Sequence, residues 1–146
     1  MLERFKVPDA DRVYVAEDKI RVATNTIFLK VGLSDEDARV ATDVLIMNDL
    51  RGVETHGVSN MLRSYVSGYG NGALNPRPEI KTLRESDTTA TWDADRGLGA
   101  HIGPAAMWVA MEKAEKHGQG AVSVTNSGHL AGAGYHAAMA AQEGMI

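Results

Sequence analysis

Two prolines set two positions apart, in the run Asn75-Pro76-Arg77-Pro78, place the strongest limit on how this chain can fold. Proline fixes its own φ and lacks a backbone N–H, and the residue before a proline avoids the helical region. The run therefore excludes a helix and predicts an extended connection. It also marks the one internal boundary that the sequence suggests, between residues 1–74 and residues 75–146.

The chain before this boundary is predicted to be mostly helical. Apolar residues recur at helical spacing in three stretches, and each stretch is followed by glycine. The predicted helices cover residues 16–31, 34–51 and 61–69. Ser34 is the expected N-cap of the second helix, because three acidic residues follow it and favour the positive end of a helix dipole.

The chain after the boundary is predicted to alternate strands and helices, so the fold class is α/β (α+β). Strands are expected at residues 79–84, 89–93 and 121–125, and helices at residues 102–117 and 134–142. An apolar strand is expected to begin at Gly144-Met145-Ile146. Because a domain usually closes with a capped element, this ending predicts a truncated chain, the front portion of a longer protein.

Composition and charge exclude several classes of function. With 44% apolar and 23% charged residues, the chain has the composition of a globular protein, and its net charge of −4 includes no basic stripe for nucleic acid. No apolar run is long enough to span a membrane, so a cytoplasmic location is predicted. The absence of cysteine excludes thiolate chemistry, and the five histidines lack the spacing of metal ligands, so no metal is expected.

The segment "RGVETHGVSN", residues 51–60, supplies the first candidate site. Imidazole titrates near neutral pH, which suits His56 to general acid–base catalysis. If a helix begins at about Thr55 or His56, then His56, Asn60 and Arg63 lie on one helical face. Such a face could protonate a carbonyl oxygen and hold a carboxylate. In the alternative interpretation, Thr55 caps the helix, His56 is solvated and Arg63 pairs with an exposed carboxylate.

The segment "NSGHLAGAGYH", residues 126–136, supplies the second candidate site. Its order of strand, glycine-rich turn and helix suits nucleotide binding, because backbone amides at such a turn favour anionic groups. The spacing is not the dinucleotide fingerprint, so an ordinary turn remains the alternative. Ser127 beside His129 leaves a hydrolase as a distant possibility, without the usual nucleophile motif. A further glycine cluster, residues 97–103, is interpreted as the entry to a helix.

Three segments together resemble the malate/L-lactate dehydrogenase family, which differs from the Rossmann-fold lactate dehydrogenases. They are "RGVETHGVSNMLRSYVSGYGNGALNPRPEI", "ATWDADRGLGAHIGPAAMWVAMEKA" and "VSVTNSGHLAGAGYHAAMAAQEGMI". The resemblance implies an oxidoreductase that uses NAD or NADP to move hydride between nicotinamide and a small 2-hydroxy or 2-oxo acid. It also implies a homodimer and a largely antiparallel, non-Rossmann sheet in the nucleotide-binding domain.

The resemblance carries over to particular residues. It implies that His56 is the proton donor, that Thr55 assists it, and that His129 lies at the nicotinamide, where some family members use this histidine as acid or base. The cofactor contacts that it implies are His129, Leu130, Ala131, Gly132 and Ala133. Many members bind the substrate carboxylate through an arginine at the position of Asn60 here. Arg63, further along the predicted helical face, is the expected substitute.

The resemblance also divides the chain by role. Residues 1–74 are expected to form the substrate and dimerisation segment, and residues 75–146 the incomplete first part of an NAD(P)-binding domain. Since family members are more than twice as long, the 146-residue chain is expected to be inactive by itself. The alternative is a truncated, non-catalytic module that acts only through protein–protein contacts.

Overall fold

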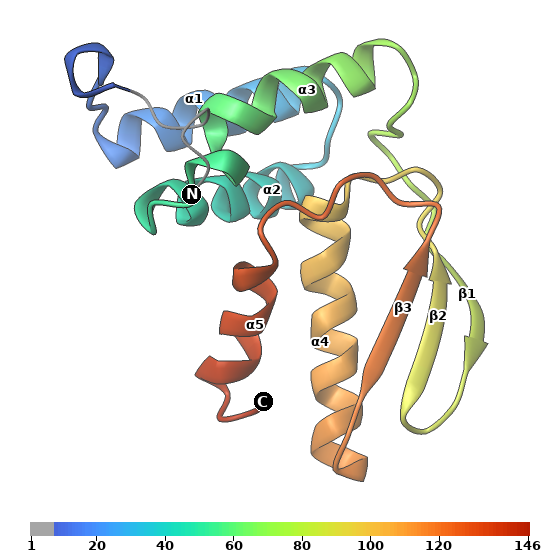
Figure 1. Cartoon of the computed structure of the whole chain (residues 1–146). Coiled ribbons are helices and arrows are strands. Elements are labelled where there is room, and N and C mark those ends of the chain that lie inside the picture. Colours follow the sequence, from blue (N-terminus) through green and yellow to red (C-terminus); the bar gives the residue numbers. More distant parts are fainter. Residues whose placement is uncertain (1–7) are drawn as a thin grey trace.

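Three helices form the first part of the chain, as the apolar spacing predicts. The computed structural model describes residues 8–146. Helices α1 (Glu17–Lys30), α2 (Asp35–Leu50) and α3 (Val58–Gly70) lie together at one end of the molecule (Figure 1). Ser34 caps α2 as predicted, because its Oγ accepts a 3.0 Å hydrogen bond from the backbone N–H of Asp37.

The second part alternates strands and helices, which confirms the α/β fold class. Its elements are β1 (Lys81–Glu85), β2 (Thr89–Asp93), α4 (Gly99–His117), β3 (Ala121–Thr125) and α5 (Ala133–Gln142). α4 begins at Gly99 rather than at the predicted residue 102. Its N-cap is Leu98, which makes no side-chain capping hydrogen bond, so the sequence contains no capping residue that would indicate this start. It ends as predicted, with Gly118 in the left-handed conformation at φ +84°.

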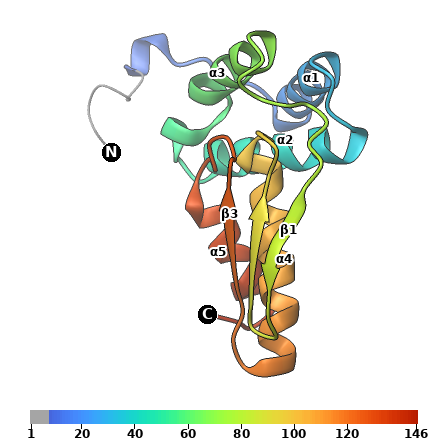
Figure 2. The same ribbon diagram turned by 90° about the vertical axis from the view of Figure 1, so that its right-hand side faces the viewer.

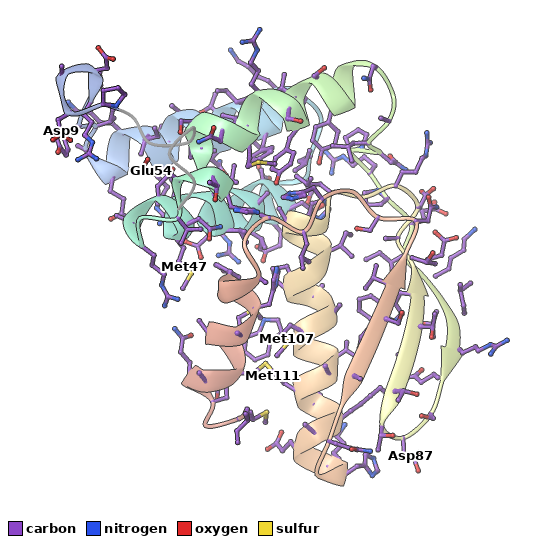
Figure 3. All side chains as sticks on the ribbon, viewed as in Figure 1. Asp9, Met47, Glu54, Asp87, Met107 and Met111 are labelled. Atoms are coloured by element: carbon purple, nitrogen blue, oxygen red, sulfur yellow. The ribbon has the colours of Figure 1, made fainter. Side chains whose placement is uncertain are left out.

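The three strands form one mixed sheet in the order β1-β2-β3. β1 pairs antiparallel with β2, and β2 pairs parallel with β3 through the α4 crossover. α4 covers one face of the sheet, and α5 lies on the other side of α4 (Figures 1 and 2). Figure 3 shows Met107 and Met111 of α4 directed toward α5. No helix within residues 8–146 is long and apolar enough to cross a bilayer.

The strand expected at Gly144 is wrong, because these residues close α5 instead. The N–H of Met145 donates to the Ala140 carbonyl oxygen (2.9 Å), and the N–H of Gly144 donates to the Ala141 carbonyl oxygen (3.2 Å). Gly144 has φ +70°. This pair of bonds around a left-handed glycine is a Schellman cap, which satisfies the last carbonyls of the helix.

The connection between the two parts is non-helical, as its prolines require. Asn75 connects this segment to the turn that follows β2. Its Nδ2 donates to Asp95 Oδ2 (2.7 Å), and its N–H donates to the Arg96 carbonyl oxygen (3.0 Å). Asp95 Oδ2 also accepts from the N–H of Glu79 (3.2 Å). These bonds fix the path of the chain between the last helical turn of α3 and the sheet.

One hydrophobic core joins the two parts at the place where the helices meet the start of α4. It draws on α1, α2 and α3 and also on the chain beyond residue 75. The buried members include Phe28, Leu33, Val44, Leu45, Leu62, Tyr65, Leu98, Ala100 and Ala131. Because this core is shared, it holds the segments that carry His56 and His129 in a fixed relation to each other.

Candidate active site

His56 lies in a 3₁₀ turn, Glu54–His56, between α2 and α3. The backbone N–H of Val58 donates to Oδ2 of Asp49 (2.8 Å), so a carboxylate of α2 caps the start of α3. A Cβ on Gly57 would collide with this carboxylate. Glycine is therefore required after His56, because the Asp49 carboxylate lies too close to Gly57 to leave room for a side chain. Burial of the Asp49 carboxylate raises its pKa.

The helical face predicted for His56, Asn60 and Arg63 is wrong, because α3 begins at Val58 and His56 precedes it. Gly57 is extended, with φ −90° and ψ −172°, and it turns the chain between His56 and the helix. Asn60 is exposed and its Nδ2 donates to the Glu54 carbonyl oxygen (2.7 Å). Arg63 is exposed on α3.

The second histidine, His129, follows β3 and accepts hydrogen bonds at Nδ1. The N–H of Ala131 donates to Nδ1 (3.1 Å), and the hydroxyl of Tyr65 lies 2.8 Å from the same nitrogen. A backbone N–H can only donate, so Nδ1 carries no proton and the neutral ring holds its proton on Nε2. Partial burial, followed by the proximity of His56, lowers the pKa of His129.

The sequence pattern identifies Tyr65 only as part of the apolar face of α3, and in the structure it is 3% exposed. Its ring packs in the core while its hydroxyl reaches His129. Tyrosine often combines an apolar body with one polar contact in this way, but the partner lies in the other part of the chain. Only the fold reveals it. Burial raises the pKa of Tyr65, so its hydroxyl keeps its proton at neutral pH.

The two histidines meet although they come from opposite sides of the proline run. Their ring centroids are 5.6 Å apart with an interplanar angle of 16°, so the rings stack. Thr55 Oγ1 lies 2.8 Å from His56 Nδ1. The structure therefore gathers the three residues that the resemblance implies for catalysis. Ser127 is not part of this group, since its Oγ lies within hydrogen-bond distance of the carbonyl oxygens of Gly97 (3.3 Å) and Gly128 (3.1 Å), which share its one hydrogen.

A cavity of about 350 Å³ opens beside His56, between the end of α2 and the start of α5. Figure 3 shows Met47 of α2 directed toward α5, on the α2 side of this space. The lining residues are Met47, Asn48, Arg51, Val53, His56, Ala131, Gly132, Ala133, Gly134 and Tyr135. Three predicted cofactor contacts thus line it, whereas the other two, His129 and Leu130, lie outside the lining.

The cavity wall at residues 131–132 is shaped by backbone conformation. Ala131 has φ +65°, in the left-handed region that residues with a Cβ rarely adopt. Such strain costs on the order of 1–2 kcal/mol and tends to be kept at functional sites. Gly132 packs on Asn48, and a Cβ at this position would collide with the Asn48 side chain. This close approach leaves main chain rather than side chains facing the cavity.

A hydrogen-bond bridge fixes α5 to the helical layer near the cavity. The hydroxyl of Tyr135 donates to Asp43 Oδ2 (2.8 Å), and Arg21 donates to Asp43 Oδ1 (2.7 Å). Burial and the contact with Asp43 raise the pKa of Tyr135 to about 12. The bridge links α1, α2 and α5, and its Tyr135 also lines the cavity.

Residues 15–146 match the sequence profile of the malate/L-lactate dehydrogenase family. The chain belongs to this family. The resemblance carried by the three quoted segments is therefore confirmed, and the profile extends across both sides of the proline run. The two stacked histidines lie on opposite sides of that run, so both fall inside the matched region.

Individual proteins of this family are similar to the chain over most of its length. The malate dehydrogenase of Pyrococcus abyssi is 45% identical over 143 residues, which cover 93% of this chain and 39% of that protein. The L-sulfolactate dehydrogenase of Methanocaldococcus jannaschii is 38% identical over 82% of this chain and 35% of its own length. The solved structure of malate dehydrogenase from Pyrococcus horikoshii OT3 matches with a TM-score of 0.87 at 42% identity, over 90% of this chain and 38% of that one. The chain thus spans less than two fifths of these relatives.

Proposed function

We propose that the protein is a nicotinamide-dependent oxidoreductase that transfers hydride between NAD(P) and a small 2-hydroxy or 2-oxo acid. The observation that carries this proposal is the stacking of His129 on His56, which lines the cavity. Relatives with the names malate dehydrogenase, L-sulfolactate dehydrogenase and hydroxycarboxylate dehydrogenase B support the substrate class.

The cavity fits part of a nicotinamide nucleotide. Its lining combines bare main chain at Gly132 with one guanidinium, from Arg51, and contains no carboxylate. An anionic nucleotide needs close backbone approach and positive charge. When bound, the nucleotide supplies or accepts the hydride. The residues of this chain bind the anion, orient the substrate and handle the proton.

The contacts at the two Nδ1 atoms assign different tasks to the two histidines. His129 already accepts at Nδ1, so its Nε2–H can donate a hydrogen bond to the substrate carbonyl oxygen and polarise it. Transfer of that proton would leave an anionic imidazolate. A second proton on Nδ1 would remove the hydrogen bond from Ala131. His129 is therefore proposed as a polarising donor, not as the proton source.

His56 is proposed as the group that moves the proton. Thr55 Oγ1 lies at its Nδ1, and a hydroxyl can donate to the neutral ring or accept from the protonated ring. During reduction of a 2-oxo acid, protonated His56 gives its proton to the carbonyl oxygen. During oxidation of a 2-hydroxy acid, neutral His56 takes the proton from the hydroxyl.

Titration of the protein with NADH and NADPH, followed by nucleotide fluorescence, tests the proposal. Saturable binding that is weakened by a His129→Ala change is expected. Binding to the 146-residue chain is expected to be weak, because its NAD(P)-binding domain is expected to be incomplete. Absence of saturable binding to a protein of family length would contradict the proposal and favour the non-catalytic module. Assays with malate, sulfolactate and lactate then identify the acid, and turnover by the 146-residue chain would exclude the non-catalytic module.

Several finer features remain predictions. They are the choice between NAD and NADP, the homodimer, the cytoplasmic location, the division of roles at residue 75, and the inactivity of the 146-residue chain by itself. The substrate contacts of Arg63 and Asn60 also remain predictions. Light scattering tests the homodimer directly, and parallel titrations with the two nucleotides test the cofactor choice.

A further inference from the structure

Arg51 is the charged residue of the cavity lining, and its guanidinium is unpaired. It forms the C-cap of α2, and within residues 8–146 its side chain makes no hydrogen bond or ion pair. Arg21 and Arg39, by contrast, bind carboxylates at 2.7 Å and 2.6 Å. An arginine kept free of carboxylates at a cavity wall is available for a ligand.

The charge of Arg51 is not compensated inside the cavity. The other lining residues are apolar, small or neutral, apart from His56, which can only add positive charge. The chain as a whole carries a net charge of −4, whereas the charged side chains that line this cavity carry no negative charge. Guanidinium binds carboxylate and phosphate through two parallel N–H donors. The cavity therefore selects an oxyanion.

The position of Arg51 also differs from that of the arginine which the sequence suggests. Both Arg51 and Arg63 are exposed, but Arg63 is absent from the cavity lining, whereas Arg51 lines the same cavity as His56. We propose that Arg51, not Arg63, anchors the oxyanion group of the ligand beside His56. This inference rests on the proposed function for the identity of the ligand, but anion binding at Arg51 can be measured without turnover.

Two sources share this chemistry: the carboxylate of the substrate acid and the phosphates of the nucleotide. The test measures dissociation constants for malonate, inorganic pyrophosphate and NADH by calorimetry, for the unaltered protein and for Arg51→Met. Loss of a charge-assisted contact should weaken the bound anion about ten- to a hundredfold. Weaker malonate binding alone identifies a carboxylate site. Weaker pyrophosphate and NADH binding identifies a phosphate site.

Matched variants separate charge from structure. Arg51→Lys keeps the charge and should recover part of the affinity, although lysine cannot make the bidentate contact. Arg63→Met removes an exposed arginine and should change each constant less than about twofold. A large loss for Arg63→Met with none for Arg51→Met would overturn the inference and restore the sequence-based prediction. Absence of any anion binding to the unaltered protein would overturn it as well.

The outcomes also distinguish this inference from the proposed function. If the anions bind through Arg51 but NADH does not bind, the oxyanion site stands and the dehydrogenase proposal fails. If NADH binds equally well to the unaltered protein and to Arg51→Met, and malonate does too, the dehydrogenase proposal stands and the role of Arg51 fails.

Discussion

The segments that carry His56 and His129 face each other but hold their rings in different ways. At His56, a hydroxyl from the neighbouring Thr55 lies at Nδ1. At His129, the backbone N–H of Ala131 donates to Nδ1 and the hydroxyl of Tyr65 joins it. A hydroxyl can follow a ring through a change of protonation, whereas a backbone N–H cannot.

This difference shows how two identical side chains in one site can take different roles. The hydrogen-bond partner of Nδ1 decides whether Nε2 is a fixed donor or a site of proton exchange. Backbone geometry supports the difference, since Ala131 adopts φ +65° and Gly57 is extended. The strained segment follows His129, the proposed fixed donor, and the short turn holds His56, the histidine proposed to exchange protons.

Replacement of each histidine by glutamine should give the largest difference in the rate of hydride transfer between the two positions. A glutamine amide can donate a hydrogen bond but cannot exchange protons near neutral pH. His56→Gln should therefore lower the rate of hydride transfer by about 10²–10⁴-fold, whereas His129→Gln should cost roughly tenfold, about 1.4 kcal/mol. Single-turnover oxidation of bound NADH by a 2-oxo acid measures both rates, in a protein of family length that carries these residues, because the 146-residue chain is expected to be inactive by itself. Equal losses, or a larger loss for His129→Gln, would contradict the assigned roles.

A Gly57→Ala change should disturb the His56 segment alone. The new Cβ would displace the Asp49 carboxylate and remove its hydrogen bond to Val58, so the free energy of unfolding should fall by about 1–3 kcal/mol. Gly70→Ala is the matched control at the other end of α3, where a Cβ meets no neighbouring atom. Urea unfolding compares the two variants. Equal stability would show that the Asp49 contact does not hold this turn.

Thr55→Val and Tyr65→Phe compare the hydroxyl groups at the two rings. Thr55→Val removes the contact at Nδ1 of His56 and should slow hydride transfer roughly tenfold, as expected for about 1–1.5 kcal/mol. Thr55→Ser keeps the hydroxyl and serves as the control. Tyr65→Phe should have a smaller effect on the rate, because Ala131 still donates to His129. A reversed order would mean that Tyr65, rather than Ala131, fixes the His129 ring.

The smallest effect concerns stability between pH 8 and pH 5. Burial lowers the pKa of both His129 and His136 in the folded chain. The unfolded chain therefore binds more protons than the folded chain in this range, and the free energy of unfolding should fall as the pH falls below about 6.5. His136→Asn should reduce this dependence, as measured by urea midpoints. A free energy of unfolding that rises as the pH falls toward 5 would contradict this prediction.

Local patterns predict most of the fold, because short-range signals decide its elements. The cap at Ser34, the stop at Gly118 and strands β2 and β3 all follow from neighbouring residues. The start of α3 was not predictable in the same way. It depends on Asp49, a carboxylate from another helix, and it moves His56 off the helix.

The candidate site depends even more on contacts that are distant in the sequence. The histidines were identified from their motifs, but their stacking and the bond from Tyr65 to His129 require the folded core. The sequence pattern indicates Arg51 only as the end of a helix, because the role proposed for it depends on which residues enclose the cavity. No local pattern predicts the left-handed conformation of Ala131.

The ring nitrogens of His129 test the central claim most directly. In the ¹⁵N-labelled protein at pH 7, NMR should show His129 neutral, with a proton on Nε2 and none on Nδ1, and it should remain so until the pH falls below the usual value near 6.5. A proton on Nδ1 at pH 7, or a positively charged ring at that pH, would contradict the account that His129 is a fixed donor and that His56 moves the proton.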